Sequence, residues 1–202
     1  MSQIVFVLSV SAVYTAISLY ICRKIKLKVT DLAIGGIICA LTLVLSYIMI
    51  PLPTGATITC GAMVPIMLLS LIYDHRLAIV CGWICGVLSI MILPLWKPVH
   101  WAQIFIEHMV CFSCLGYAGI FGTDKKWKVI CGCSIAGIIK YAAHVFSGVV
   151  FFSQNSWTGW GTWSYSRHYN LSSTLPEILI SAALLIILPT KSIRTSLARV
   201  KS

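Results

Sequence analysis

Long apolar runs separated by short polar connections dominate the chain. A helix needs about 20 predominantly apolar residues to span a bilayer, and most of these runs approach that length. The pattern therefore predicts an all-α integral membrane protein. Its predicted helices run over 4–22, 32–50, 60–73, 77–95, 101–121, 129–152 and 174–188, with outer connections at 51–59, 96–100 and 153–173.

The composition agrees with this pattern. Apolar residues make up 59% of the 202 residues and charged residues 10%, and the mean hydropathy is +0.94. A soluble domain is roughly half apolar and about a quarter charged. One compact membrane domain without an attached soluble domain is expected.

The net charge of +10 would suggest nucleic acid as a partner if the protein were soluble. The basic residues, however, gather at the ends of alternate predicted helices, which is the cytoplasmic bias of the positive-inside rule. The charge is therefore a topology signal that predicts a cytoplasmic C-terminus and no nucleic-acid partner. The basic residues concerned are Arg23, Lys24, Lys26, Lys28, Arg76, Lys125, Lys126, Lys128, Lys191, Arg194, Arg199 and Lys201.

A stripe of special residues marks the predicted helix at 129–152. Lys140, His144, Gly148 and Phe152 follow one another at four-residue steps, which places them on one helix face. The helix then leads into the tryptophan-rich segment 153–173, which we interpret as a lid over a pocket. An interfacial aromatic belt is the alternative role for these tryptophans.

Glu107 is the one carboxylate well inside a predicted apolar segment. At 1.5 Å per residue it lies about 9 Å below the outer end of its helix, and His144 lies about 12 Å below the end of the next. An ionisable group at this depth costs a few kcal/mol and by default faces a cavity or a partner. The alternative is a structural ion pair with Lys140 or His144. Gln103 extends the same face, whereas the adjacent His108 points about 100° away and is expected to pack or lie at the rim.

Other polar groups have simpler interpretations. Thr174, Pro176 and Glu177 fit a capping box with proline in the first helical turn, so we expect Glu177 to cap a helix. The nine cysteines lack the spacing of zinc ligands and are expected to pack, and no metal site is predicted. No ATP-binding, metalloprotease or esterase motif is present, which predicts that the chain is not an enzyme.

These residues favour a pocket for a flat organic cation. A buried carboxylate balances the charge, ring faces add cation–π attraction of about 1 to 2 kcal/mol, and amides fix orientation. Two other classes remain open. His108 and His144 could bind haem in a membrane redox protein, or Glu107 and His144 could relay protons in a self-sufficient transporter.

Several segments resemble a known family. PLPTGATITCGAMVPI, QIFIEH, KYAAHVFSGVVFF, and YSRHYN followed by LPE are similar to the thiamin-specific substrate-binding subunit (S component) of energy-coupling-factor transporters. The resemblance covers about residues 30 to 190. It implies a six-helix core, here preceded by one extra N-terminal transmembrane helix, and leaves a subunit for another vitamin as an alternative.

The resemblance also implies a ligand and its contacts. Thiamin would bind from outside the cell membrane, with no resident cofactor. The implied substrate-binding residues are Glu107, His144, Lys140, Gly148, Phe152, Tyr165, Asn170 and His108. Two of these positions depart from the family, since Phe152 and His108 stand where the family can have tryptophan and tyrosine.

The partners and the division of the chain follow from the same resemblance. A transmembrane coupling protein and two ATPases would supply the work, and the coupling protein would dock on Ala33, Gly36 and Ala40, although packing within the subunit is an alternative for such small residues. The expected parts are 1–28 (extra helix and basic linker), 29–190 (vitamin-binding membrane domain) and 191–202 (basic cytoplasmic tail).

Overall fold

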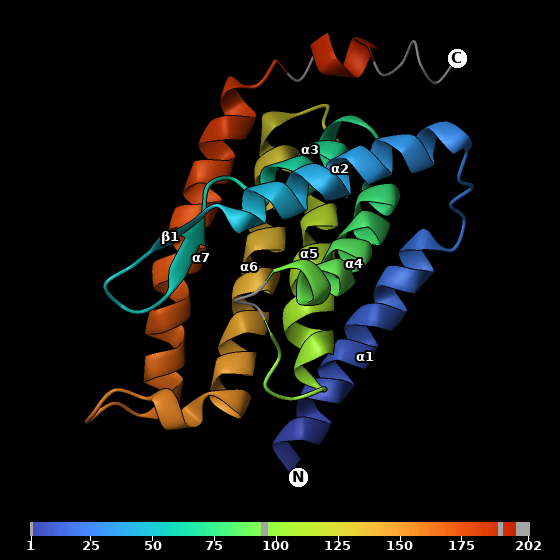
Figure 1. Cartoon of the computed structure of the whole chain (residues 1–202). Coiled ribbons are helices and arrows are strands. Elements are labelled where there is room, and N and C mark those ends of the chain that lie inside the picture. The colour runs from blue at the N-terminus through green and yellow to red at the C-terminus, as the bar shows by residue number, and fades with distance from the viewer. Residues whose placement is uncertain (1, 94–96, 190–191, 197–202) are drawn as a thin grey trace.

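The computed structural model describes residues 2–93, 97–189 and 192–196. Helices dominate it, and five of those described are long and apolar enough to cross a membrane (Figure 1). The elements are α1 (Ser2–Cys22), α2 (Val29–Tyr47), β1 (Met49–Pro51), β2 (Thr57–Thr59), α3 (Val64–Ile72), α4 (His75–Ile92), η1 (Ile104–Val110), α5 (Cys111–Ser113), η2 (Cys114–Gly119), α6 (Lys126–Phe151), η3 (Ser153–Asn155) and α7 (Thr162–Ile187).

The expected all-α membrane fold is confirmed. Each predicted helix has a counterpart, because η1, α5 and η2 form one continuous helix, here called helix five (Ile104–Gly119). Helix five begins as a π-helix, passes through one α-helical turn and ends as a 3₁₀-helix. The six helices from α2 to α7 form the core, and α1 is additional (Figure 1).

The connection after α2 differs from the prediction. Residues 51–59 were expected to form an outer loop, but β1 and β2 pair as an antiparallel hairpin in which Met49 faces Thr59 and Pro51 faces Thr57. The β-branched run after Gly55 favours a strand. Gly55 itself has φ +86°, a conformation that glycine adopts without strain.

The start of α7 also differs. The helix begins at Thr162 and not near Thr174, so Pro176 lies inside it. Membrane helices tolerate an internal proline because neighbouring groups satisfy the freed carbonyl. The buried polar residues of α7 recur every three or four positions, which is the helical period that the apolar pattern alone did not reveal. They are Ser166, Asn170, Thr174, Glu177 and Ser181.

Helix five lies between α4 and α6 at backbone contact. A Cβ atom on Gly82 of α4 would lie 2.3 Å from the Cα of Ser113, and one on Gly132 of α6 would lie 2.0 Å from the carbonyl oxygen of Ala118. Such distances leave no room for any side chain at either glycine. The two neighbours therefore fix the position of helix five, which carries Glu107.

Contacts near the ends of the helices join basic connections that are distant in the sequence. The thiol of Cys22, at the end of α1, lies 3.6 Å from the carbonyl oxygen of Arg76. Arg194 donates a hydrogen bond of 3.1 Å to Thr123 in the connection before α6. The basic clusters are thus brought together in pairs. Lys191, Arg199 and Lys201 lie outside the described residues, as do the boundary at 190–191 and the predicted helix end at 95.

Candidate binding site

A cavity of about 370 Å³ lies between helix five, α6, α7 and the β1–β2 hairpin. Its size is that of a site for a small organic molecule. The lining combines ring faces with ionisable groups and amides. It consists of Gly55, Ala56, Thr57, Lys97, Gln103, Glu107, His108, Cys111, Phe112, Lys140, His144, Phe152, Tyr169, Asn170, Ser173, Thr174 and Glu177.

Glu107 is held in place by one of its two carboxylate oxygens. Gln103 and Ser147 both donate hydrogen bonds to Oε2, the latter at 2.6 Å. His144 Nδ1 lies 3.7 Å from the other oxygen, Oε1, and 27% of the Glu107 side chain remains exposed. The carboxylate is therefore oriented without being enclosed, and Oε1 retains capacity to interact with a ligand.

The stripe on α6 faces this cavity through its charged members. Lys140 Nζ lies 3.9 Å from Glu177 Oε2, and only 12% of the Lys140 side chain is exposed. The ion pair that was considered between Lys140 and Glu107 is thus formed with Glu177 instead. Lys140 Nζ also lies 5.9 Å from the centre of the Phe112 ring.

Glu177 does not cap a helix, so that prediction is wrong. It lies in the middle of α7 and is buried, and its Oε1 accepts hydrogen bonds from the backbone N–H of Thr59 at 2.9 Å and from the Thr59 hydroxyl at 2.7 Å. Glu177 therefore joins the hairpin to α7 and Lys140. The prediction failed because a Thr-x-x-Glu pattern with a proline resembles a capping box locally. The actual partner of Glu177, Thr59, is distant in the sequence.

We expect Glu177→Ala to weaken binding of the cavity's ligand roughly tenfold, because two hydrogen bonds worth about 0.5 to 1.5 kcal/mol each are lost. Most of this loss should appear as faster ligand dissociation, measured by stopped-flow fluorescence. Glu177→Gln retains an oxygen for Thr59 and should have a smaller effect. Identical effects of the two variants would mean that the hairpin contact does not hold the ligand.

The remaining predicted site residues fall into two groups. Phe152 and Asn170 line the cavity with Glu107, Lys140 and His144. Gly148 and Tyr165 are not in the lining. A Cβ atom on Gly148 would lie 2.3 Å from Ser166 Oγ, so this glycine allows α6 and α7 to pack closely. Tyr165 is buried behind Tyr169, with ring centres 5.6 Å apart.

His108 borders the cavity but is turned towards α4. It is 3% exposed, and its Nδ1 lies 3.1 Å from the hydroxyl oxygen of Ser89. This agrees with a packing role and gives no support to haem ligation by His108 and His144. Within the described ranges, no group of three or more His, Cys, Asp or Glu side chains is arranged to hold a metal ion.

The proposed lid requires correction. Residues 162–173 belong to α7, and the tryptophans Trp157 and Trp160 pack edge-to-face against each other and against His168. The hairpin covers the cavity instead: the Tyr169 hydroxyl donates to the carbonyl oxygen of Gly55 at 3.2 Å, and the hydroxyl oxygens of Thr54 and Ser172 lie 3.0 Å apart.

Several contributors were missed from the sequence, among them Phe112, Tyr169, Ser147 and the hairpin tip. Tyr169 stands beside Asn170 in YSRHYN, and a helical reading of that segment would have placed both residues with Ser173 on one face. Ser147 follows His144 by three residues, a spacing that puts both near Glu107. No local signal places residues 55–57 over the cavity.

Comparisons with known proteins identify the family. The profile of the family described as Thiamine transporter protein (Thia_YuaJ) matches residues 32–197. The chain is 27% identical over 177 residues to the thiamine transporter ThiT of Bacillus subtilis (strain 168), covering 82% of this chain and 91% of that protein. The solved structure of ThiT from Listeria monocytogenes has the same fold, with a TM-score of 0.70 at 24% identity, covering 81% of this chain and 94% of that one. Since the family profile spans most of the sequence, the chain belongs to the thiamine transporter protein family.

Proposed function

We propose that this chain captures thiamin from outside the cell as the substrate-binding subunit of an energy-coupling-factor uptake transporter. The observation that carries the proposal is the oriented carboxylate of Glu107 beside a cavity of about 370 Å³. Thiamin joins a positively charged thiazolium ring to an aminopyrimidine. A carboxylate in a poorly hydrated site attracts such a cation more strongly than it would in water.

The charges around the cavity favour a ligand with a single positive charge. Among the buried and half-buried acids and lysines of the lining, Glu107 and Glu177 contribute two negative charges and Lys140 one positive charge, a sum of −1. The other lysine of the lining, Lys97, is exposed and donates a hydrogen bond to the carbonyl oxygen of Ile90. A monocation neutralises this sum. A dianionic ligand would increase the unbalanced charge in a region where charge is costly.

Rings and amides suit the two heterocycles. Phe112, Phe152 and Tyr169 offer faces for stacking and cation–π contact. The side-chain N–H groups of Asn170 donate to the carbonyl oxygens of Ser166 and His144 at 2.8 and 3.3 Å, which leaves Oδ1 as an acceptor for the aminopyrimidine.

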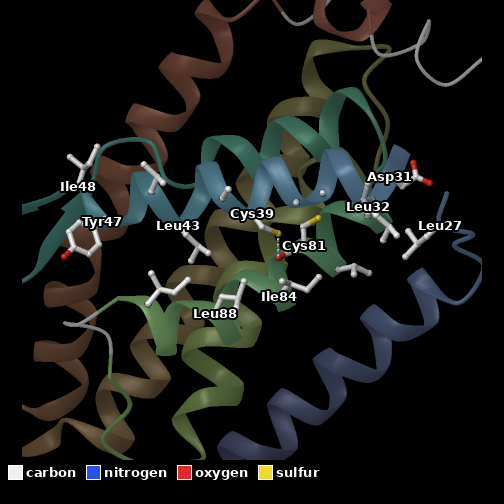
Figure 2. Close-up of a pocket in the computed structure, with 17 residues that line it drawn as sticks. Leu27, Asp31, Leu32, Cys39, Leu43, Tyr47, Ile48, Cys81, Ile84 and Leu88 are labelled. Carbon is white, nitrogen blue, oxygen red and sulfur yellow. Dashed lines mark hydrogen bonds between the residues drawn. The ribbon is translucent and has the colours of Figure 1, made fainter. Parts of the chain in front are cut away.

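The surface of α2 supports docking of a transmembrane coupling protein. Gly36 and Ala40 are exposed and line an apolar groove of about 870 Å³ between α2 and α4 (Figure 2). Packing within the subunit is carried out by the neighbouring Gly35 and Cys39, which face α4. Small residues at a membrane surface allow a partner helix to approach closely. The coupling protein and two ATPases would supply the energy, so no catalysis is assigned to this chain.

Titration of the purified protein with thiamin tests the proposal. Intrinsic tryptophan fluorescence should change saturably, because Trp157 packs at 5.2 Å against Tyr165, which adjoins the cavity residue Tyr169. Oxythiamin, with a carbonyl in place of the amino group, is the matched control ligand and should bind more weakly. Absence of saturable binding up to millimolar thiamin would overturn the proposal, as would a strong haem absorption band in the purified protein.

A further inference from the structure

The N-terminal helix α1 lies outside the region that the family profile matches, which begins at residue 32. It is nevertheless packed along the core, in contact with η1, α4 and α6 (Figure 1). The buried residues on its inner face lie four or seven positions apart, and some of them are polar. Val7, Ser11, Ser18 and Cys22 on this face are all less than 10% exposed.

Hydrogen bonds join α1 to helix five. The Ser113 hydroxyl donates to the carbonyl oxygen of Met109 at 2.6 Å, so its contact of 2.9 Å with the Tyr14 hydroxyl has Tyr14 as the donor. In the same way Ser18 donates to the carbonyl oxygen of Tyr14 at 2.9 Å, and the Tyr117 hydroxyl therefore donates to Ser18 at 2.7 Å.

These contacts reach the segment that presents Glu107. Met109 belongs to the π-helical part of helix five, only two residues after Glu107. Towards the other end of α1, Val7 is fully buried in a cluster that includes Ala102, Ile106 and Val110. Thus α1 contacts helix five both before and after Glu107 in the sequence.

A π-helix has poorer backbone geometry than an α-helix and depends on its surroundings. The hydrocarbon region of a membrane contains no water that could replace a lost hydrogen-bond partner of a hydroxyl such as that of Tyr117. If lipid replaced α1, Tyr117 would lose its partner and Ser113 its donor. Helix five would then have freedom to shift away from the cavity.

We propose that α1 is a brace that holds helix five, and with it Glu107, in the thiamin-binding position. Tyr14 and Ser18 are the positioning residues. The inference rests on the proposed function, since its readout is thiamin affinity. It assigns a role to the helix that the family profile does not include.

The test is the double variant Tyr14→Phe/Ser18→Ala in the full chain, titrated with thiamin by tryptophan fluorescence. Loss of two membrane hydrogen bonds should lower thiamin affinity roughly tenfold. The matched control is Tyr20→Phe/Ser9→Ala, which makes the same chemical changes on exposed positions of α1 and should bind like the unaltered protein. The single variant Tyr14→Phe, which keeps Ser18, serves if the double variant does not fold.

A double-mutant cycle with Glu107→Gln separates positioning from general loosening. If α1 acts through Glu107, the effect of Tyr14→Phe/Ser18→Ala should disappear once the carboxylate is removed. Additive effects would overturn the inference, as would unaltered affinity in the double variant while the control also binds normally. Failure of the unaltered protein to bind thiamin would instead overturn the proposed function.

Discussion

Replacing Glu107 with glutamine should weaken thiamin binding roughly 100-fold, because loss of one member of a desolvated charge pair costs about 3 kcal/mol. The change is nearly isosteric. The amide oxygen still accepts from Gln103 and Ser147, which now hold Oε2, so the geometry of helix five is retained. Only the negative charge beside His144 is lost. Isothermal titration calorimetry of the purified variant measures the effect.

The unliganded Glu107→Gln protein should be no less stable than the original. A half-buried carboxylate without a fully matched cation is costly, and its removal relieves that cost. Thermal unfolding in the absence of thiamin checks this. Asp124→Asn is the control for loss of a carboxylate, since Asp124 is 58% exposed in its pair with Lys128 and lies in the connection before α6. Equal affinities of the two variants would show that Glu107 does not contact the cation.

Polar groups are costly in lipid, and this cost explains what could be predicted from the sequence. Membrane-spanning segments are long and apolar for this reason, so Glu107, Lys140 and His144 are exceptional, and their sequence positions alone pointed to one cavity. The structure brings all three to its lining. The four-residue steps along α6 were informative for Phe152 as well. They could not show that Gly148 faces Ser166, because one stripe along α6 can include residues that line the cavity and residues that pack against α7.

The remaining part depends on contacts between distant segments. Glu177 and Thr59 are 118 positions apart, and their hydrogen bond exists only because the hairpin folds over α7. A local capping pattern explained Glu177 equally well until that contact was known. The π-helical start of helix five is similarly hidden, because an apolar pattern of this length does not distinguish i→i+4 from i→i+5 bonding.

The second large effect concerns α2. The double variant Gly36→Leu/Ala40→Leu should reduce thiamin uptake at least tenfold in cells that express the coupling proteins, while thiamin binding by the purified subunit changes less than twofold. Both positions are exposed and line the groove, and nothing lies within 4 Å of a Cβ placed on Gly36. The new side chains remain compatible with lipid but prevent close approach of a partner helix. Uptake of labelled thiamin by cells and titration of the purified subunit with thiamin measure the two quantities, and copurification of the coupling protein measures docking.

Two further variants make this result specific to the groove. Ala16→Leu makes the same change as Ala40→Leu at an exposed position on α1 and should leave uptake unaltered. Gly35→Leu is a change of the opposite kind, because a Cβ at Gly35 would lie 3.1 Å from the sulfur of Cys81 and a larger side chain must separate α2 from α4. It should therefore lower binding as well as uptake. Normal uptake by Gly36→Leu/Ala40→Leu would place the docking surface elsewhere, because no partner helix approaching within van der Waals contact of α2 could accommodate two added leucine side chains.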